Sequence, residues 1–262
     1  MLIVERHAKL LAILRQRKTA QLDELARELG VSTSTVRRDL ESLEEQQHVQ
    51  RTHGGAVYRE PHALPQAGHP ALASRMDENV AAKQAIGRHA AGLVQPYMTL
   101  ILDGGSTVIY AARQITARPL QIVTNSLAIA NHFADDEQVE LLLIGGNLYP
   151  RTGVLVGPIA TGCLADLHAD MVFFSLAGLY QNDAFNINLT MAQVEQAMMR
   201  QAARRVMLMD ASKFGRKSLV RVCSLDELDA IITDDAVDPA WRDALGERLH
   251  IAPGQSQSTP RG

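Results

Sequence analysis

Apolar residues recur at helical spacing in the N-terminal part of the chain and predict three helices. The first covers residues 3–17, and the second ends at Gly30, which suits the left-handed cap of a helix C-terminus. The third follows Ser32, a good N-cap residue. Its buried stripe consists of Val36, Leu40 and Leu43. A helix, a glycine-containing turn and another helix form the skeleton of a helix-turn-helix.

Beyond this region the pattern first lapses and then changes. Residues 60–75 contain three prolines among His, Ala, Gly and Gln, which predicts a linker. Helix-like and strand-like segments then alternate. The expected strands are 98–102, 120–124, 139–144, 170–176, 205–210 and 229–233, and the expected helices are 77–94, 106–116, 126–134, 157–167, 190–203 and 239–248. This alternation predicts a mostly parallel sheet wrapped by helices, with runs such as Leu141 to Ile144 buried on both faces.

The expected fold class is therefore α/β, with a winged helix-turn-helix domain in front. The domain boundaries are 1–59 for the helix-turn-helix, 60–75 for the linker, 76–251 for the α/β domain and 252–262 for a disordered tail. Apolar residues of helix 190–203 are interpreted as core rather than subunit interface.

Composition excludes some kinds of binding site but does not identify the protein's function. The 26 Lys and Arg against 29 Asp and Glu give a formal net charge of −3, so any DNA contact must come from a few well-placed arginines. Cys163 and Cys223 lack CxxC spacing and a nearby His cluster, so we expect two buried thiols, no disulfide and no metal site. We expect no cofactor.

Nothing in the sequence predicts export or membrane insertion. The N-terminus has no cleavable hydrophobic stretch, and no run approaches the ~18 apolar residues that a membrane helix requires. A soluble, cytoplasmic protein is expected.

The third helix carries a polar face opposite its aliphatic stripe. At about 100° per residue from Val36, Arg38 falls near 200° and Ser34 near 160°, away from the core direction. An Arg-Arg pair is more often an inert solvated face, but this one follows a Gly-Val-Ser turn and precedes a hairpin, or wing, at 49–58. The candidate DNA-contacting residues are Ser32, Ser34, Thr35, Arg37, Arg38, Arg51, His53 and Gly54.

Polar loops follow the predicted strands of the second domain. They are Asp103-Gly104-Gly105-Ser106-Thr107, Thr124-Asn125-Ser126, Gly145-Gly146-Asn147, Gly178 and Asp210 to Gly215 with Lys213. Taken singly, the Gly-Gly-Ser-Thr turn is more often structural and the lysine more often solvated. Ligands of open parallel sheets gather at this edge, however, and together the loops supply hydroxyls, amides and a cation suited to a phosphorylated sugar. Arg151 is a weaker phosphate candidate, because a surface arginine is the commoner interpretation.

Both domains resemble the DeoR family of transcriptional regulators. The motifs are Glu-Leu-Ala at 24–26, Val-Ser at 31–32, Thr-Val-Arg-Arg-Asp-Leu at 35–40, Arg-Thr-His-Gly-Gly-Ala at 51–56 and the strand-end loops above. The resemblance implies a sensor domain similar to ribose-phosphate and glucosamine-phosphate isomerases. Its implied effector-binding residues are Asp103, Gly105, Ser106, Thr107, Asn125, Ser126, Gly146 and Lys213. Residues 181–190 depart from the Gly-rich stretch that the family commonly has there.

The function implied is a sequence-specific regulator, with repression as the family's usual mode. It would bind double-stranded operator DNA as a homodimer or homotetramer, modulated by a sugar phosphate. Asp39 in the third helix would hold an arginine or a backbone amide rather than touch DNA. Two alternatives remain at this point: a sugar-phosphate isomerase using Asp103, Asp210 or Glu195, although no paired acid/base motif demands one, and a DNA-architectural protein without a ligand.

Overall fold

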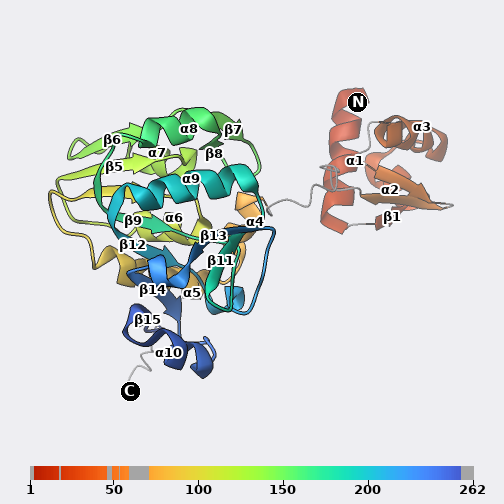
Figure 1. Cartoon of the computed structure of the whole chain (residues 1–262). Coiled ribbons are helices and arrows are strands. Elements are labelled where there is room, and N and C mark those ends of the chain that lie inside the picture. The colour runs from red at the N-terminus through yellow and green to blue at the C-terminus, as the bar shows by residue number, and fades with distance from the viewer. Residues whose placement is uncertain (1–2, 18, 46–48, 53, 59–70, 255–262) are drawn as a thin grey trace, which may run out of the picture. The chain divides into compact units, whose positions relative to one another are not determined.

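The computed structural model describes residues 3–17, 19–45, 49–52, 54–58 and 71–254, and the chain divides into two compact units (Figure 1). The first comprises residues 1–67 and the second residues 68–262. Each unit has its own hydrophobic core.

The first unit contains the expected helix-turn-helix and a small antiparallel sheet. Its elements are α1 (Ile3–Arg17), β1 (Thr19–Gln21), α2 (Leu22–Leu29), α3 (Thr33–Glu45), β2 (Val49–Thr52) and β3 (Gly55–Tyr58), with sheet order β1-β3-β2. As expected, α2 ends at Gly30 in the left-handed region with φ of 64°, and the stripe of Val36, Leu40 and Leu43 is buried. The short strand β1 was not expected.

The second unit is built on a seven-stranded, entirely parallel sheet. Its elements are α4 (Leu72–Asp77), α5 (Val80–Ala91), β4 (Thr99–Leu102), α6 (Ser106–Ala112), β5 (Leu120–Thr124), α7 (Leu127–Phe133), β6 (Val139–Leu143), β7 (Asn147–Tyr149), β8 (Val154–Val156), α8 (Pro158–Leu164), β9 (Ala169–Phe174), β10 (Gly178–Tyr180), β11 (Asp183–Asn186), α9 (Leu189–Arg200), β12 (Ala202–Leu208), β13 (Val220–Ser224), β14 (Ala230–Asp234), α10 (Pro239–Leu245) and β15 (Leu249–Ala252). The strand order is β15-β14-β12-β9-β4-β5-β6, and the parallel pairing of its strands confirms the prediction of a mostly parallel sheet.

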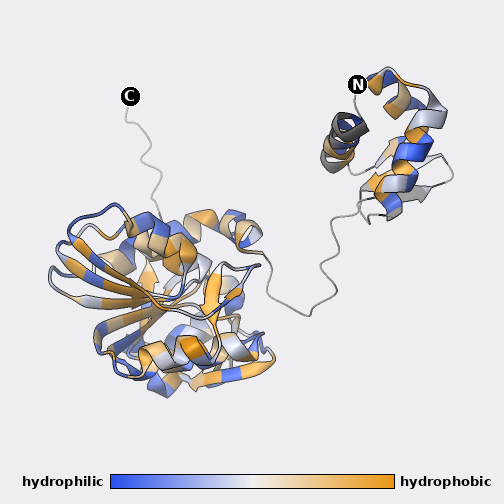
Figure 2. Cartoon of the chain, turned by 90° about the horizontal axis from the view of Figure 1, so that it is seen from above, coloured by the Kyte–Doolittle hydropathy of each residue, from blue (hydrophilic) through white to orange (hydrophobic). Residues whose placement is uncertain are grey.

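Helices cover both faces of this sheet, whose strands are largely apolar (Figure 2). Residues of α5, α6 and α7 pack on one face around Leu100, Ile122 and Phe173. Residues of α8 and α9 pack on the other face around Ile101 and Phe174. Met191, Val194, Ala197 and Met198 of α9 belong to this core, which confirms their interpretation as core.

Three expectations about the second unit's limits and edges were wrong. The predicted linker reached residue 75, but α4 begins at Leu72, whose backbone N donates to Arg151 O at 2.8 Å. The predicted tail began at Ala252, which is buried in β15, and the rest of that prediction, from residue 255, lies outside the described residues. Leu142 and Leu143 are exposed because β6 is the last strand of the sheet.

The cysteine prediction was half right. Cys223 is buried, and this burial raises the pKa of its thiol to about 12, whereas Cys163 is exposed. The sequence analysis did not predict the β7–β8 hairpin or the β10-β11-β13 sheet, because their strands are short.

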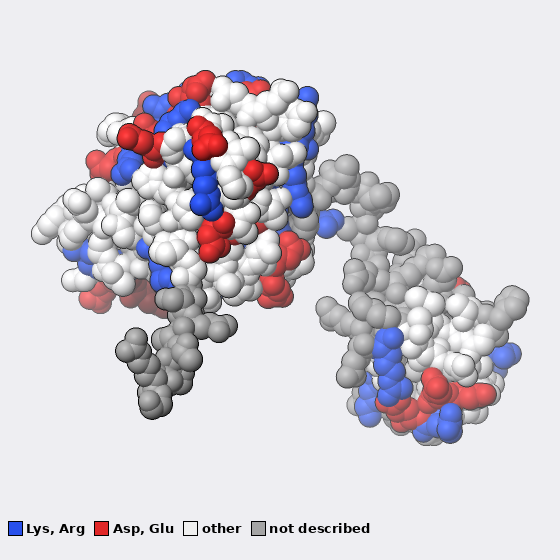
Figure 3. Space-filling model, turned by 90° about the horizontal axis from the view of Figure 1, so that it is seen from below, with Lys and Arg blue, Asp and Glu red and all other residues white. Residues whose placement is uncertain are grey.

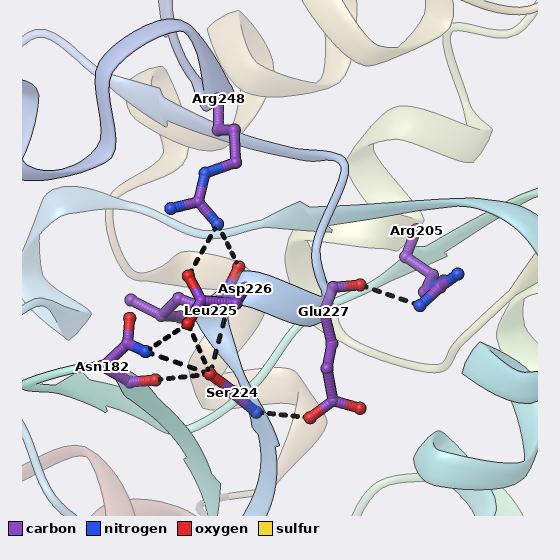
Figure 4. Close-up of polar contacts among 7 residues, drawn as sticks. All are labelled: Asn182, Arg205, Ser224, Leu225, Asp226, Glu227 and Arg248. Atoms are coloured by element: carbon purple, nitrogen blue, oxygen red, sulfur yellow. Dashed lines mark hydrogen bonds and ion pairs between the residues drawn. The ribbon is translucent and has the colours of Figure 1, made fainter.

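Residues 181–190, where the sequence departs from the family pattern, form an ordered part of that second small sheet. Asn182 donates through Nδ2 to Asp226 Oδ2 at 2.7 Å and to Ser224 Oγ at 3.1 Å, which ties the β10–β11 turn to the end of β13 (Figure 4). Asn188 then caps α9 by accepting from Met191 N at 3.1 Å. Side-chain amides thus stabilise a segment for which a Gly-rich pattern was expected.

Candidate functional site

The N-terminal half of α3 presents the expected polar face. Ser32, Ser34, Arg37 and Arg38 are exposed, and Thr35 is half-buried. Ser32 caps the helix, because its Oγ accepts from Thr35 N at 3.2 Å, and it lies 2.8 Å from the hydroxyls of both Ser34 and Thr35. Three hydroxyls and two guanidinium groups are therefore available on one end of a helix held by its aliphatic side.

A buried ion pair fixes α3 against α1. Asp39 accepts from Arg6 Nε at 2.5 Å and from Arg6 Nη2 at 2.9 Å, and its Oδ1 lies 3.2 Å from His7 Nε2. Burial alone would raise the pKa of Asp39, but the hydrogen bonds from Arg6 and His7 outweigh it and lower that pKa. The expectation that Asp39 holds an arginine is confirmed.

The wing depends on a close approach between β1 and β3. Leu22 N donates to Gly54 O at 2.8 Å, and Gly55 pairs with Gln21. Gly54 is exposed, whereas the side chain of Arg51 and the whole of His53 lie outside what the structure describes. The hairpin is therefore present, but its two candidate contact side chains stay predictions.

Gly55→Ala is expected to destabilise the first unit by about 1–3 kcal/mol through overpacking. A Cβ at this position would lie 2.1 Å from the backbone O of Ala20, whereas a Cβ at Gly54 would meet nothing within 4 Å. Hydrogen exchange of the α1–α3 amides in the full chain measures the effect, with Gly54→Ala as the matched control. Equal exchange rates in the two variants would contradict this packing.

The candidate effector loops meet where the strand order reverses. Chain connections run from β4 to β5 and β6 on one side, and β9, β12, β14 and β15 lie on the other, so the reversal falls between β4 and β9. Asp103 N donates to Phe173 O at 2.9 Å, and a Cβ on Gly105 would lie 2.7 Å from Ser175 Cβ. Open parallel sheets bind ligands at such a crevice.

Asp103 organises this edge. It is 3% exposed, and its carboxylate accepts from the backbone amides of Gly104, Gly105 and Ser175. Burial nevertheless raises its pKa, since desolvation outweighs these hydrogen bonds. Asp103 thus joins the loops after β4 and β9, and its predicted contact with the effector stays a prediction.

Ser106, Thr107, Asn125 and Ser126 are all buried at the same edge. Neither the Ser106 nor the Thr107 hydroxyl has a hydrogen-bond partner among the residues that the structure describes. Asn125 donates through Nδ2 to Leu155 O at 3.2 Å, but its Oδ1 is buried without a partner. Ser126 Oγ caps α7 through Ile129 N. Among the described residues, these loops therefore hold buried hydroxyl and amide groups at one edge of the sheet, of which Asn125 Oδ1 has no hydrogen-bond partner.

Gly146 and Lys213 have different environments. A Cβ on Gly146, whose φ is 146°, would lie 2.8 Å from Val156 O, so this glycine lets the β7–β8 hairpin close. Lys213 is half-buried in the loop after β12, near enough to Lys83 for their charges to interact. That loop is held by Asp210, which accepts from Ser212 N at 3.1 Å and from Asn79 Nδ2 at 2.9 Å.

Both halves of the chain match known family models. A DeoR-like helix-turn-helix domain matches residues 6–62, and a DeoR C-terminal sensor domain matches residues 78–235. The chain belongs to the DeoR family of transcriptional regulators. As a DeoR-family protein it is a DNA-binding regulator and not an enzyme.

Relatives align over most of their length. The uncharacterized HTH-type transcriptional regulator YulB of Bacillus subtilis is 30% identical over 95% of each chain, and the HTH-type transcriptional repressor GlcR of the same organism is 32% identical over 92% of each. The L-fucose operon activator of Escherichia coli is 33% identical over 80% of this chain and 86% of that one. A ribose 5-phosphate isomerase from Methanocaldococcus jannaschii covers 52% of this chain and 55% of its own at 18% identity and a TM-score of 0.37, a likeness too weak to carry an argument.

The DeoR sensor domain has further buried polar residues that the sequence did not single out as ligand candidates. Arg75 Nε and Nη2, Thr152 Oγ1 and Glu195 Oε2 are buried without a hydrogen-bond partner. Asn186 Nδ2 donates to Glu195 Oε1 at 2.5 Å. Burial, and next the charge of Asp103, raise the pKa of Glu195 well above its ordinary value. Glu195 was named in the sequence only as a possible acid of an isomerase, and Arg75 and Thr152 are identified by their unpaired buried atoms alone.

Other parts of this DeoR-family chain offer less. A surface hollow of about 420 Å³ between α9 and β13 is lined by Arg205 and Arg221, but these arginines already bind Glu227 O and Asp183. On the face shown in Figure 3, acidic and basic side chains alternate over the second unit. The described residues include no cluster of three metal-ligating side chains and no helix long and apolar enough to span a bilayer.

Proposed function

We propose that this protein represses genes of carbohydrate metabolism by binding operator DNA, and that a phosphorylated sugar at the sheet edge modulates this binding. The observation that carries the proposal is the polar end of α3, where Arg37 and Arg38 are exposed opposite a fully buried aliphatic stripe. The name of one relative, the L-fucose operon activator, supports the assignment to carbohydrate metabolism. The name of another, the transcriptional repressor GlcR, supports repression. The site of action is the cytoplasm.

On DNA, the end of α3 enters the major groove. Arg37 and Arg38 reach guanine edges or phosphates, and Ser32, Ser34 and Thr35 contact the backbone or bases beside them. The wing places Arg51, His53 and Gly54 against phosphate or the minor groove. One such unit makes few base contacts, so we propose a homodimer or homotetramer that binds repeated half-sites.

At the effector site, the proposed contacts come from loops on both sides of the strand reversal. Ser106, Thr107 and Asn125 provide hydroxyl and amide groups, and Lys213 provides a positive charge for a phosphate. Asp103, Gly105, Ser126 and Gly146 hold the loops in place through their backbone contacts and close packing.

The proposal is tested by fluorescence anisotropy. Purified protein is titrated onto DNA from upstream of its own and neighbouring genes at fixed salt, with and without a panel of five- and six-carbon sugar phosphates. We expect tight, sequence-dependent binding that one compound releases. Failure to bind any fragment would overturn the regulator's proposed operator, and binding that ignores every compound would overturn the effector class.

Lys213→Ala is expected to leave DNA affinity unchanged and to raise the sugar phosphate concentration needed for release by about 10-fold, the loss of one charge-assisted contact. Lys217→Ala is the matched control, because Lys217 is exposed nearby and its Nζ lies 5.9 Å from the Tyr180 ring centroid. An unaltered dose-response in Lys213→Ala would remove this lysine from the site.

A further inference from the structure

Arg75 is a half-buried arginine whose guanidinium has two buried nitrogens without a hydrogen-bond partner. It lies in α4, and its Nε and Nη2 are buried and unpartnered. Burial lowers the pKa of Arg75, and the carboxylates of Asp103, Glu78 and Glu195 act in the opposite direction. Two cationic N–H groups that are buried without partners cost free energy, which an anionic ligand would recover.

Helix α4 lies against the β7–β8 turn, because Leu72 N donates to Arg151 O at 2.8 Å, and this turn follows the strand-end loops of the candidate effector site. The charge of Arg75 interacts with Asp103, which organises the strand reversal, and with Glu195, which is 2% exposed and has one unpartnered oxygen. Thr152, 1% exposed, and Asn125, 2% exposed, each contribute another unpartnered buried oxygen. Arg151 beside Thr152 adds a buried, unpartnered Nε. Two guanidinium groups, a hydroxyl and an amide oxygen are donors and acceptors suited to a phosphate monoester and its neighbouring hydroxyls.

Helix α4 and Asn79, which follows it as the N-cap of α5, are hydrogen-bonded to three other segments of the second unit. Leu72 N donates to Arg151 O in the β7–β8 turn, Tyr110 Oη of α6 donates to Met76 O at 3.0 Å, and Asn79 Nδ2 reaches Asp210 Oδ1. Lys83, 3% exposed, donates through Nζ to the carbonyls of Arg75 and of Glu78. A change at the strand-end loops therefore reaches α4 through direct hydrogen bonds.

The position of α4 along the chain gives these contacts a regulatory meaning. It is the first element described after residues 59–70, which connect the two units. We infer that Arg75 binds the anionic group of the effector and that α4 reports occupancy of the pocket to the connecting segment. This inference rests on the proposed function, because it assigns a further ligand contact and the route of regulation to the same site. The effector can change DNA binding only if its affinity for the DNA-binding form of the protein differs from its affinity for the form that does not bind DNA.

The test measures phosphate binding and the response of α4 in the full chain. Isothermal titration with inorganic phosphate is expected to show at least a tenfold weaker affinity in Arg75→Met, which keeps the apolar stem but removes the charge, and an intermediate affinity in Arg75→Lys. Arg88→Met, at an exposed position of α5, is the matched control and is expected to bind as the wild type does. Hydrogen exchange is expected to show phosphate-dependent protection of the α4 amides in the wild type and not in Arg75→Met.

The possible outcomes distinguish a failure of the Arg75 inference from a failure of the proposed sugar-phosphate site. Equal phosphate affinity in Arg75→Met and wild type, or α4 amides indifferent to phosphate, would overturn the inference even if DNA binding and release by a sugar phosphate persist. A wild-type chain that binds neither phosphate nor any sugar phosphate would overturn the proposed effector site as well. A folding defect is recognised separately, because the fluorescence of Trp241, the single tryptophan, reports on the second unit.

Discussion

Asp39→Asn is expected to lower the free energy of unfolding of the first unit by about 1–3 kcal/mol, as large an effect as that expected for Gly55→Ala. The substitution keeps the shape of the side chain but leaves the guanidinium of Arg6, only 12% exposed, without a counter-charge between α1 and α3. A unit of this size has little stability to lose. Hydrogen exchange of the α1 and α3 amides in the full chain measures the change, and Trp241 fluorescence is expected to stay as in the wild type.

An exposed pair in the same unit provides the control. Arg17 and Glu28 lie 3.0 Å apart with side chains 48% and 42% exposed, so Glu28→Gln is expected to have almost no effect. The pH dependence adds a second readout. Because the folded pKa of Asp39 is lowered, its contribution is complete above the ordinary value of about 3.9 and is lost as pH falls through the lowered value. Asp39→Asn should lack this acid-dependent loss, and an unchanged acid profile would contradict the role of the pair.

Arg38→Ala is expected to weaken specific DNA binding by about 5- to 150-fold, equivalent to ~1–3 kcal/mol, while the fold stays intact. Arg38 is exposed at the end of α3 and contributes nothing to the core beneath it. If it contacts a guanine, discrimination between operator variants falls at one position; if it contacts phosphate, affinity falls uniformly and the salt dependence decreases by about one unit.

Lys9→Ala is the matched control for lost charge, because Lys9 lies exposed on α1. Anisotropy titrations at several salt concentrations distinguish the two contact types for Arg38. Operator affinity in Arg38→Ala equal to that of Lys9→Ala would exclude this face of α3 from the proposed DNA interface.

Helices and strands could be predicted from the sequence where their pattern of apolar residues was long enough to show a period. The stripe of Val36, Leu40 and Leu43 spans two helical turns and predicted both the buried and the exposed side of α3. The strand-end loops were found because parallel strands all end at one edge. By contrast, α4 has only six residues and directly follows a stretch with three prolines, so it is too short for periodicity to separate it from a linker.

Long-range partners were beyond the reach of local pattern. Asp39 was expected to hold an arginine, but nothing in the spacing indicated Arg6, 33 positions earlier. Glu195 follows the apolar spacing of a core helix, so its role at the sheet edge depends on Asn186 and Asp103, which only the fold brings near it. Likewise, Leu142 and Leu143 look like a central strand until the strand order places β6 at the edge.

The strand reversal between β4 and β9 has a consequence for a chain emerging from the ribosome. The helix-turn-helix and wing are complete at Tyr58, whereas the candidate effector site also requires Ser175 and Lys213, in the loops after β9 and β12, which are synthesised much later. At roughly 5–20 residues per second, the 155 residues from Tyr58 to Lys213 take about 8–30 s to translate. During that interval a nascent chain carries the candidate DNA-binding helix before its candidate effector site is complete, so the proposed effector cannot yet act on it.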